Sequence, residues 1–151
     1  KDAEGPSPKE MESTFTRLSK QPFDKARKPL EDLYFWRFTW KQNNRNQNNP
    51  AYTRIFERMR KYLVENYTRL LDKAVVRARN SGLTDADIKK LTPEMELAGS
   101  LEEKVAAATA PLGPLHELKR LDPEKAKQLE KKYAKEIRRA RQVSSALTPP
   151  M

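Results

Sequence analysis

The chain has 151 residues, enough for one ordinary domain, and a formal net charge of +10 that favours a polyanion as partner. Charged residues make up 34% of it and hydrophobic residues 36%, less than the roughly 45–50% apolar residues (glycine included) of a typical globular domain. The absence of cysteine excludes disulfides, zinc knuckles, iron–sulfur clusters and thiol catalysis. No apolar run reaches 18 residues, so the sequence predicts no transmembrane segment.

The positive charge is concentrated in two blocks of the chain. Residues 41–80 carry ten positive and three negative side chains, and residues 122–151 carry eight and four. The rest of the chain is close to charge balance. Both basic blocks coincide with the longest predicted helices, and such clustering favours a polyanionic partner more than evenly spread lysine would.

The first residues lack any hydrophobic periodicity. Residues 1–13 contain two prolines and a glycine, which predicts an extended N-terminal arm. Phe15 and Leu18, three residues apart, indicate a short helical turn near 14–19. Two prolines then bound a brief segment that ends at Pro29.

A burst of aromatic residues follows between positions 29 and 41. Leu30, Leu33 and Tyr34 recur at helical spacing, which predicts a helix. The run YFWRFTW is also rich in residues that favour strands. A strand would need a partner strand, and the sequence offers no second convincing one. We therefore expect a helix here.

An amide-rich stretch separates this segment from a long helix. Residues 42–49 (QNNRNQNN) predict a polar loop, because asparagine competes with the backbone for hydrogen bonds. Asn49 as cap and Pro50 in the first turn then begin a helix over about 50–80. Its apolar stripe runs from Tyr52 to Ala78 at steps of three and four residues.

The middle of the chain is acidic and predicts short capped helices. Thr84 caps the first, and Ser100 with Glu103 has the spacing of a capping box. Asp122 then opens a basic C-terminal helix over about 123–146, whose narrow apolar seam must lie on another element. The sequence thus predicts an all-α, elongated scaffold with three parts: an arm (1–13), a helical region (14–121) centred on the aromatic segment 30–40 and the helix 50–80, and a C-terminal helix and tail (122–151).

Catalytic chemistry has little support. His116 is the only histidine, so no histidine pair or histidine-based metal cluster can form. The paired carboxylates stand where helix capping explains them. The four glycines are too scattered for a phosphate-binding loop. We expect no catalytic residue, metal, cofactor or small-molecule substrate.

Two sets of residues are candidates for binding macromolecules. The basic faces either bind phosphates or are solvated, and the aromatic cluster serves as core or protein anchor in preference to a base-stacking surface. The RNA-contact candidates are Arg45, Arg54, Arg58, Lys61, Arg69, Lys73, Arg77, Lys131, Lys132, Lys135, Arg138, Arg139 and Arg141. The protein-interface candidates are Tyr34, Phe35, Trp36, Phe38, Trp40, Tyr52 and Phe56.

These features favour a non-catalytic subunit of a large assembly. Leu33 and Tyr34, followed by Arg37 ahead of a basic helix, resemble the Leu-Tyr-Arg helical adaptors of mitochondrial assemblies; two aromatic residues stand where the arginine would follow the tyrosine, and no function is carried over. We expect an accessory protein of a mitochondrial ribosome, in the matrix, that contacts rRNA and neighbouring protein subunits. The alternative is a peripheral subunit of a respiratory or ATP-synthase complex, and a free DNA-binding module is a weaker third hypothesis.

Overall fold

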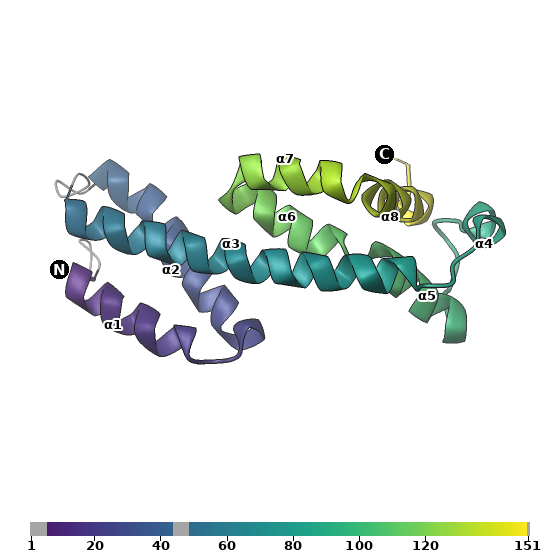
Figure 1. Cartoon of the computed structure of the whole chain (residues 1–151). Helices are drawn as coiled ribbons and strands as arrows, with labels where there is room; N and C mark the ends of the chain where they lie inside the picture. The colour runs from purple at the N-terminus through teal and green to yellow at the C-terminus, as the bar shows by residue number, and fades with distance from the viewer. Residues whose placement is uncertain (1–5, 44–48, 151) are drawn as a thin grey trace. The chain divides into compact units, whose positions relative to one another are not determined.

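The computed structural model describes the backbone of residues 6–43 and 49–150, and the side chains of residues 6–36 and 49–150. Within these stretches the chain forms helices and no strand, which confirms the predicted all-α class (Figure 1). The helices are α1 (Pro8–Ser19), α2 (Phe23–Asn43), α3 (Pro50–Arg79), α4 (Asp85–Lys90), α5 (Gly99–Thr109), α6 (Leu112–Leu121), α7 (Pro123–Lys132) and α8 (Ala134–Leu147). None of these helices combines the length and apolar character needed to cross a membrane.

The chain divides into two compact units, Lys1–Asn66 (unit 1) and Tyr67–Met151 (unit 2). The division falls inside α3, whose first part belongs to unit 1 and whose last part belongs to unit 2. Residues 122–147 pack within unit 2, since α8 contacts α5 and α7 contacts α6. The units therefore do not follow the divisions at residues 13 and 121 that the sequence predicts.

Unit 1 begins with a helix where the sequence predicts an extended arm. The Ser7 side chain accepts a hydrogen bond from the Glu10 backbone, and the Glu10 carboxylate accepts one from the Ser7 backbone. This capping box starts α1 at Pro8. The prediction of an extended segment is thus wrong for residues 8–13, while residues 1–5 lie outside the described part.

The aromatic segment is helical, and its helix is longer than predicted. α2 begins at Phe23 and continues through Pro29, although proline removes one intrahelical hydrogen bond. Burial of Ala26, Leu30 and Tyr34 on both sides of the proline stabilises the helix. At its other end α2 includes residues 42 and 43, so the predicted loop is wrong there, and residues 44–48 are not described.

The long helix α3 confirms the strongest prediction. Asn49 accepts a hydrogen bond at 2.9 Å from the Ala51 backbone and so caps its first turn. The predicted apolar stripe is buried from Tyr52 to Ala74 except for the half-buried Leu70. After Arg79 the chain turns at Gly82, whose φ of 74° is the left-handed conformation that glycine adopts without strain.

Unit 2 has an aliphatic core to which α4, α5 and α8 contribute. Its buried residues include Leu83, Leu91, Val105, Ala108 and Val143. The predicted cap of α4 forms, because Thr84 and Asp87 make a capping box. The capping box predicted at Ser100 is wrong: Ser100 already lies inside α5, which begins at Gly99 after an Ala98 that makes no side-chain cap.

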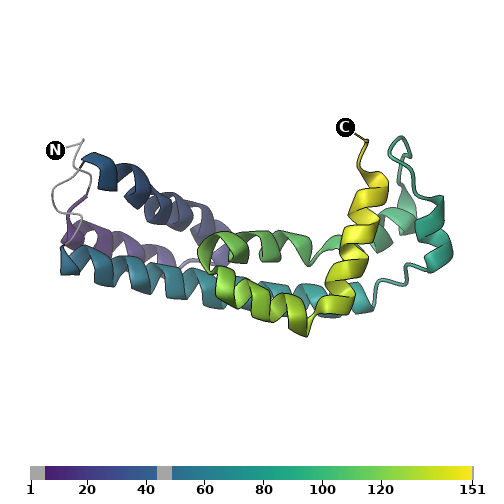
Figure 2. The same ribbon diagram turned by 90° about the horizontal axis from the view of Figure 1, so that it is seen from above.

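The predicted continuous helix over 123–146 is wrong, because it consists of two helices. The chain breaks at Tyr133, whose backbone (φ −112°, ψ 30°) leaves the helical conformation. The Tyr133 hydroxyl donates a hydrogen bond to Asp72 of α3. α8 then runs at a steep angle to α7 (Figure 2). Leu129 of α7 and Ile137 of α8 are both buried in unit 2.

Candidate interaction surfaces

In unit 1, the first part of α3 presents cationic side chains to solvent. Arg54, Arg58 and Lys61 are all exposed, and their spacing of four and three residues places them on one face. Arg58 forms an ion pair with Glu12 and lies 5.4 Å from the centre of the Phe15 ring. Arg58 therefore ties α3 to α1, which leaves Arg54 and Lys61 as the stronger candidates for a partner.

In unit 2, the last part of α3 continues the same pattern. Arg69, Lys73 and Arg77 are exposed, four residues apart, whereas Leu71 on the other side is fully buried. Val76 stands among these cations and is 52% exposed, the only large hydrophobic side chain so exposed among those described. A single exposed valine is normal on a protein surface, so the exposed cations alone make this part of α3 a candidate contact surface.

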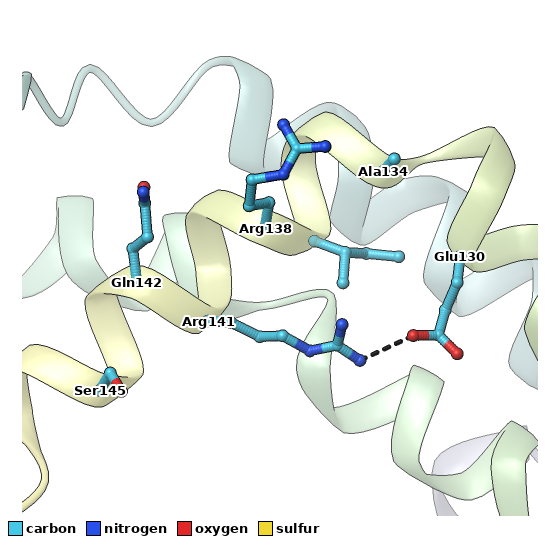
Figure 3. A pocket seen from close by; sticks show the side chains of 7 residues that line it. Glu130, Ala134, Arg138, Arg141, Gln142 and Ser145 are labelled. Atoms are coloured by element: carbon cyan, nitrogen blue, oxygen red, sulfur yellow. Dashed lines mark hydrogen bonds and ion pairs between the residues drawn. The ribbon is translucent and has the colours of Figure 1, made fainter.

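A second polar surface lies at the elbow between α7 and α8. A hollow of about 470 Å³ opens there (Figure 3). Across it, Arg141 donates a hydrogen bond of 2.8 Å to Glu130, and Lys119 of α6 lies 3.7 Å from the same carboxylate oxygen. The hydrogen bond from Arg141 is the main cause that lowers the pKa of Glu130, so this carboxylate is ionised at neutral pH. Arg138 and Gln142 project from one side of α8 near the hollow.

Two arginines connect α8 to neighbouring segments of unit 2. Arg139 donates to Asp85 and to the Leu83 carbonyl, both at 2.6 Å. Arg79 donates to Glu136 at 2.7 Å. Burial raises the pKa of Glu136, but this hydrogen bond and the Arg79 charge outweigh it, and the pKa lies below its usual value. Arg139 thus has intramolecular partners in unit 2, and its role as an RNA contact stays a prediction.

The remaining cationic candidates of the C-terminal region lie on the surface. Lys131, Lys132, Lys135 and Arg138 are exposed. The Lys132 ammonium lies 5.2 Å from the centre of the Tyr133 ring, a cation–π contact. Among the side chains that the structure describes, none forms an ion pair with Arg138. Arg138 is therefore the α8 arginine most available to an anion.

Three of the predicted interface aromatics lie in the core. Tyr34 is 2% exposed, and its ring centre lies 6.3 Å from that of Phe56, in an edge-on arrangement. Tyr52 stacks on Phe56, and its hydroxyl donates to the Pro6 carbonyl at 2.9 Å. In this conformation these rings contact their own chain, so they cannot dock on a neighbour. The spacing of the sequence does not distinguish core rings from interface rings.

The structure describes only some of the remaining interface and RNA-contact candidates. Phe35 and Trp36 are half-buried and remain interface candidates. Phe38, Trp40 and Arg45 lie outside the described side chains. Beside Trp36, a hollow of about 480 Å³ opens between α1 and α2. The residues lining it are Pro6, Thr14, Arg17, Leu18, Pro29, Asp32, Leu33 and Trp36.

Sequence patterns did not find the residues that complete the α7–α8 hollow. Glu130 and Arg141 are eleven residues apart, so they would lie about 16 Å apart along an unbroken helix. Only the break at Tyr133 brings them together. Gln142 and Ser145 carry no charge and gave no signal, although they also line the hollow.

No protein-family model, curated protein or solved structure matches this chain. Its function is therefore inferred from the charge, exposure and hydrogen bonds of its own side chains. The two cationic parts of α3 and the α7–α8 hollow are the surfaces that these properties single out.

Proposed function

We propose that the chain is a non-catalytic structural subunit of a large ribonucleoprotein assembly, most concretely an accessory protein of a mitochondrial ribosome. The exposed cations of α3 contact rRNA in this proposal. Protein neighbours dock near Phe35 and Trp36, the half-buried rings of α2.

One observation carries the proposal: four of the exposed cations of α3 form no ion pair with a described acidic side chain. Arg54, Lys61, Lys73 and Arg77 are exposed, and none forms an ion pair with an acidic side chain that the structure describes. α3 offers only three acidic residues of its own against eight arginines and lysines. Unpaired surface cations are the groups with which proteins neutralise phosphates, and each such contact releases a counterion.

The experiment is RNA binding at several salt concentrations. Fluorescence anisotropy with a labelled single-stranded RNA of about 20 nucleotides measures the affinity of the whole chain. In the first variant, Arg54, Lys61, Lys73 and Arg77 are all replaced by Gln. We expect the slope of log affinity against log salt to become shallower by about 0.7 for each phosphate that the variant no longer neutralises.

A matched control removes the same charge from other surfaces. Lys9, Lys20, Lys25 and Arg27 of the α1–α2 region are exposed, and replacing all four by Gln also lowers the net charge by four. If both variants lose the same affinity and salt dependence, α3 is not the RNA-binding face. Absence of RNA binding by the unmodified chain would reject the proposed function.

The alternative, a peripheral subunit of a respiratory or ATP-synthase complex, is favoured by one observation. The hollow beside Trp36 has a largely apolar lining, which suits a protein neighbour. Fractionation of mitochondria distinguishes the ribonucleoprotein hypothesis from this alternative. Comigration with ribosomal particles and release by high salt support the ribonucleoprotein; comigration with a membrane complex that requires detergent supports the alternative.

A further inference from the structure

The hollow at the α7–α8 elbow gathers hydrogen-bond donors from successive turns of one helix. Arg138, Arg141, Gln142 and Ser145 line it, and positions i, i+3, i+4 and i+7 share one side of a helix. Ala134 and the buried Ile137 contribute an apolar part of the lining. Figure 3 shows Arg138 and Gln142 projecting from one side of α8 while Arg141 reaches across toward Glu130.

A single carboxylate oxygen faces two cations in this hollow. Oε2 of Glu130 accepts the hydrogen bond from Arg141 at 2.8 Å, and the Lys119 ammonium lies 3.7 Å from the same atom. Arg138, on the next turn, has no ion pair with any described acidic group. Glu130 therefore balances only part of the positive charge, and the hollow keeps an excess of cations.

The donor set fits a phosphate joined to a sugar. Arginine, glutamine and serine side chains are typical contacts of phosphate and sugar oxygens in nucleic-acid complexes, and a guanidinium forms two parallel hydrogen bonds to a phosphate. The volume of about 470 Å³ lies within the range of ligand pockets, about 300–1,000 Å³. The hollow thus has room for one nucleotide's phosphate and ribose.

We propose that this hollow binds a backbone phosphate of RNA and that Glu130 competes with this phosphate for Arg141. In the free protein the Glu130 carboxylate holds Arg141; in the complex a phosphate takes its place. The exchange is cheap, because Glu130 and Arg141 side chains are 27% and 49% exposed and such ion pairs contribute little to stability. This inference rests on the proposed function, since the ligand is RNA.

The test replaces Glu130 by Gln in the full chain. Glu130→Gln removes the competing charge and frees Arg141, so RNA binding should become tighter, roughly 3- to 10-fold near physiological salt, with a salt slope steeper by about 0.7. The same 20-nucleotide RNA and anisotropy assay serve as readout. The gain should disappear when Arg138 and Arg141 are also replaced by Gln.

Glu117→Gln is the matched control. Glu117 forms an ion pair with Arg120 at 2.8 Å, and its side chain is 24% exposed, close to the 27% of Glu130. The control changes the net charge by the same amount but leaves the hollow intact, so its effect should stay below about 2-fold. Equal gains from Glu117→Gln and Glu130→Gln, or none from Glu130→Gln, would overturn the inference.

Three further outcomes separate the possibilities. If Glu130→Gln does not fold, as judged by circular dichroism, Arg138→Gln decides instead: a weaker affinity and a shallower salt slope support the site, and no change overturns it. If a polyglutamate of similar length gains as much as RNA from Glu130→Gln, the hollow binds carboxylates and the inference fails. If the unmodified chain binds RNA and Glu130→Gln binds it no more tightly, the inference fails and the proposed function stands. If the unmodified chain binds no RNA, the proposed function itself is rejected.

Discussion

The two units of this chain bury different kinds of side chain. The core of unit 1 is rich in rings: Phe15, Tyr34, Tyr52 and Phe56 are buried there beside aliphatic residues, and their rings meet one another or Tyr62 edge-on or stacked. The core of unit 2 consists mainly of leucine, valine and alanine, with the rings of Tyr67 and Tyr133. Unit 1 therefore gains a larger share of its burial from rings than unit 2 does.

Small residues have a particular role in unit 2. Ala108 of α5 and Ala140 of α8 are buried, and α5 and α8 contact each other. Alanine at a contact lets helix backbones approach closely. Ion pairs between distant residues, Arg79 with Glu136 and Arg139 with Asp85, connect α8 to the end of α3 and the start of α4. Unit 1 should thus be sensitive to a decrease in side-chain volume, and unit 2 to an increase.

The largest expected effect is the removal of a core ring from unit 1. Phe56→Ala removes a buried ring that contacts both Tyr34 and Tyr52, so we expect the free energy of unfolding to fall by about 3–5 kcal/mol. Both tryptophans, Trp36 and Trp40, lie in unit 1. Urea unfolding followed by tryptophan fluorescence therefore reports on this unit.

Thr16→Ala is the control for this prediction. Thr16 is exposed in α1 of unit 1, so its truncation should change stability by no more than about 0.5 kcal/mol. A loss below about 1 kcal/mol for Phe56→Ala would mean that the aromatic cluster does not hold unit 1 together, and the contrast between the units would fail.

The second effect is overpacking in unit 2. Ala140 is fully buried, and Ala140→Leu adds volume where no space is left, so we expect a loss of about 1–3 kcal/mol. Circular dichroism should show it in the unfolding transition. Ala106→Leu, on the exposed side of α5, adds the same atoms and should be nearly neutral. Equal effects of both variants would contradict close packing at Ala140.

Local sequence rules predicted much of the fold. The apolar stripe of α3 and its Asn49 cap, together with the Thr84 capping box, are local patterns, and the structure confirms them. The capping box at Ser7 and Glu10 is also a local pattern, but the prediction of an extended arm rested on the prolines and the missing periodicity and did not use it. The prediction that the aromatic helix starts at Pro29 was also wrong, because tertiary burial keeps α2 helical on both sides of this proline.

The candidate site could be predicted only in part. The cationic face of α3 follows from helical spacing within one element, so the sequence placed Arg54 and Lys61 correctly in the exposed set. At the break, the Tyr133 hydroxyl donates a hydrogen bond to Asp72, 61 residues away in the chain. No local pattern encodes such a contact, and the hollow that follows from it could not be predicted.

The smallest expected effect concerns this break. Tyr133→Phe keeps the ring but removes the hydroxyl that donates to Asp72, so we expect a loss of about 1 kcal/mol at neutral pH. This hydrogen bond, followed by burial, raises the pKa of Tyr133 above its usual 10.0.

A raised pKa means that the folded chain favours the protonated tyrosine. Its stabilising contribution is therefore complete below pH 10, the ordinary pKa, and is lost as the pH rises through the raised value. The difference in unfolding free energy between wild type and Tyr133→Phe should shrink over that range, which urea titrations at pH 8 to 11 measure. A nonzero difference that stays constant would contradict the raised pKa. A difference near zero at every pH would show that Tyr133 acts through its ring alone, and unit 2 would then depend on packing as fully as unit 1 does.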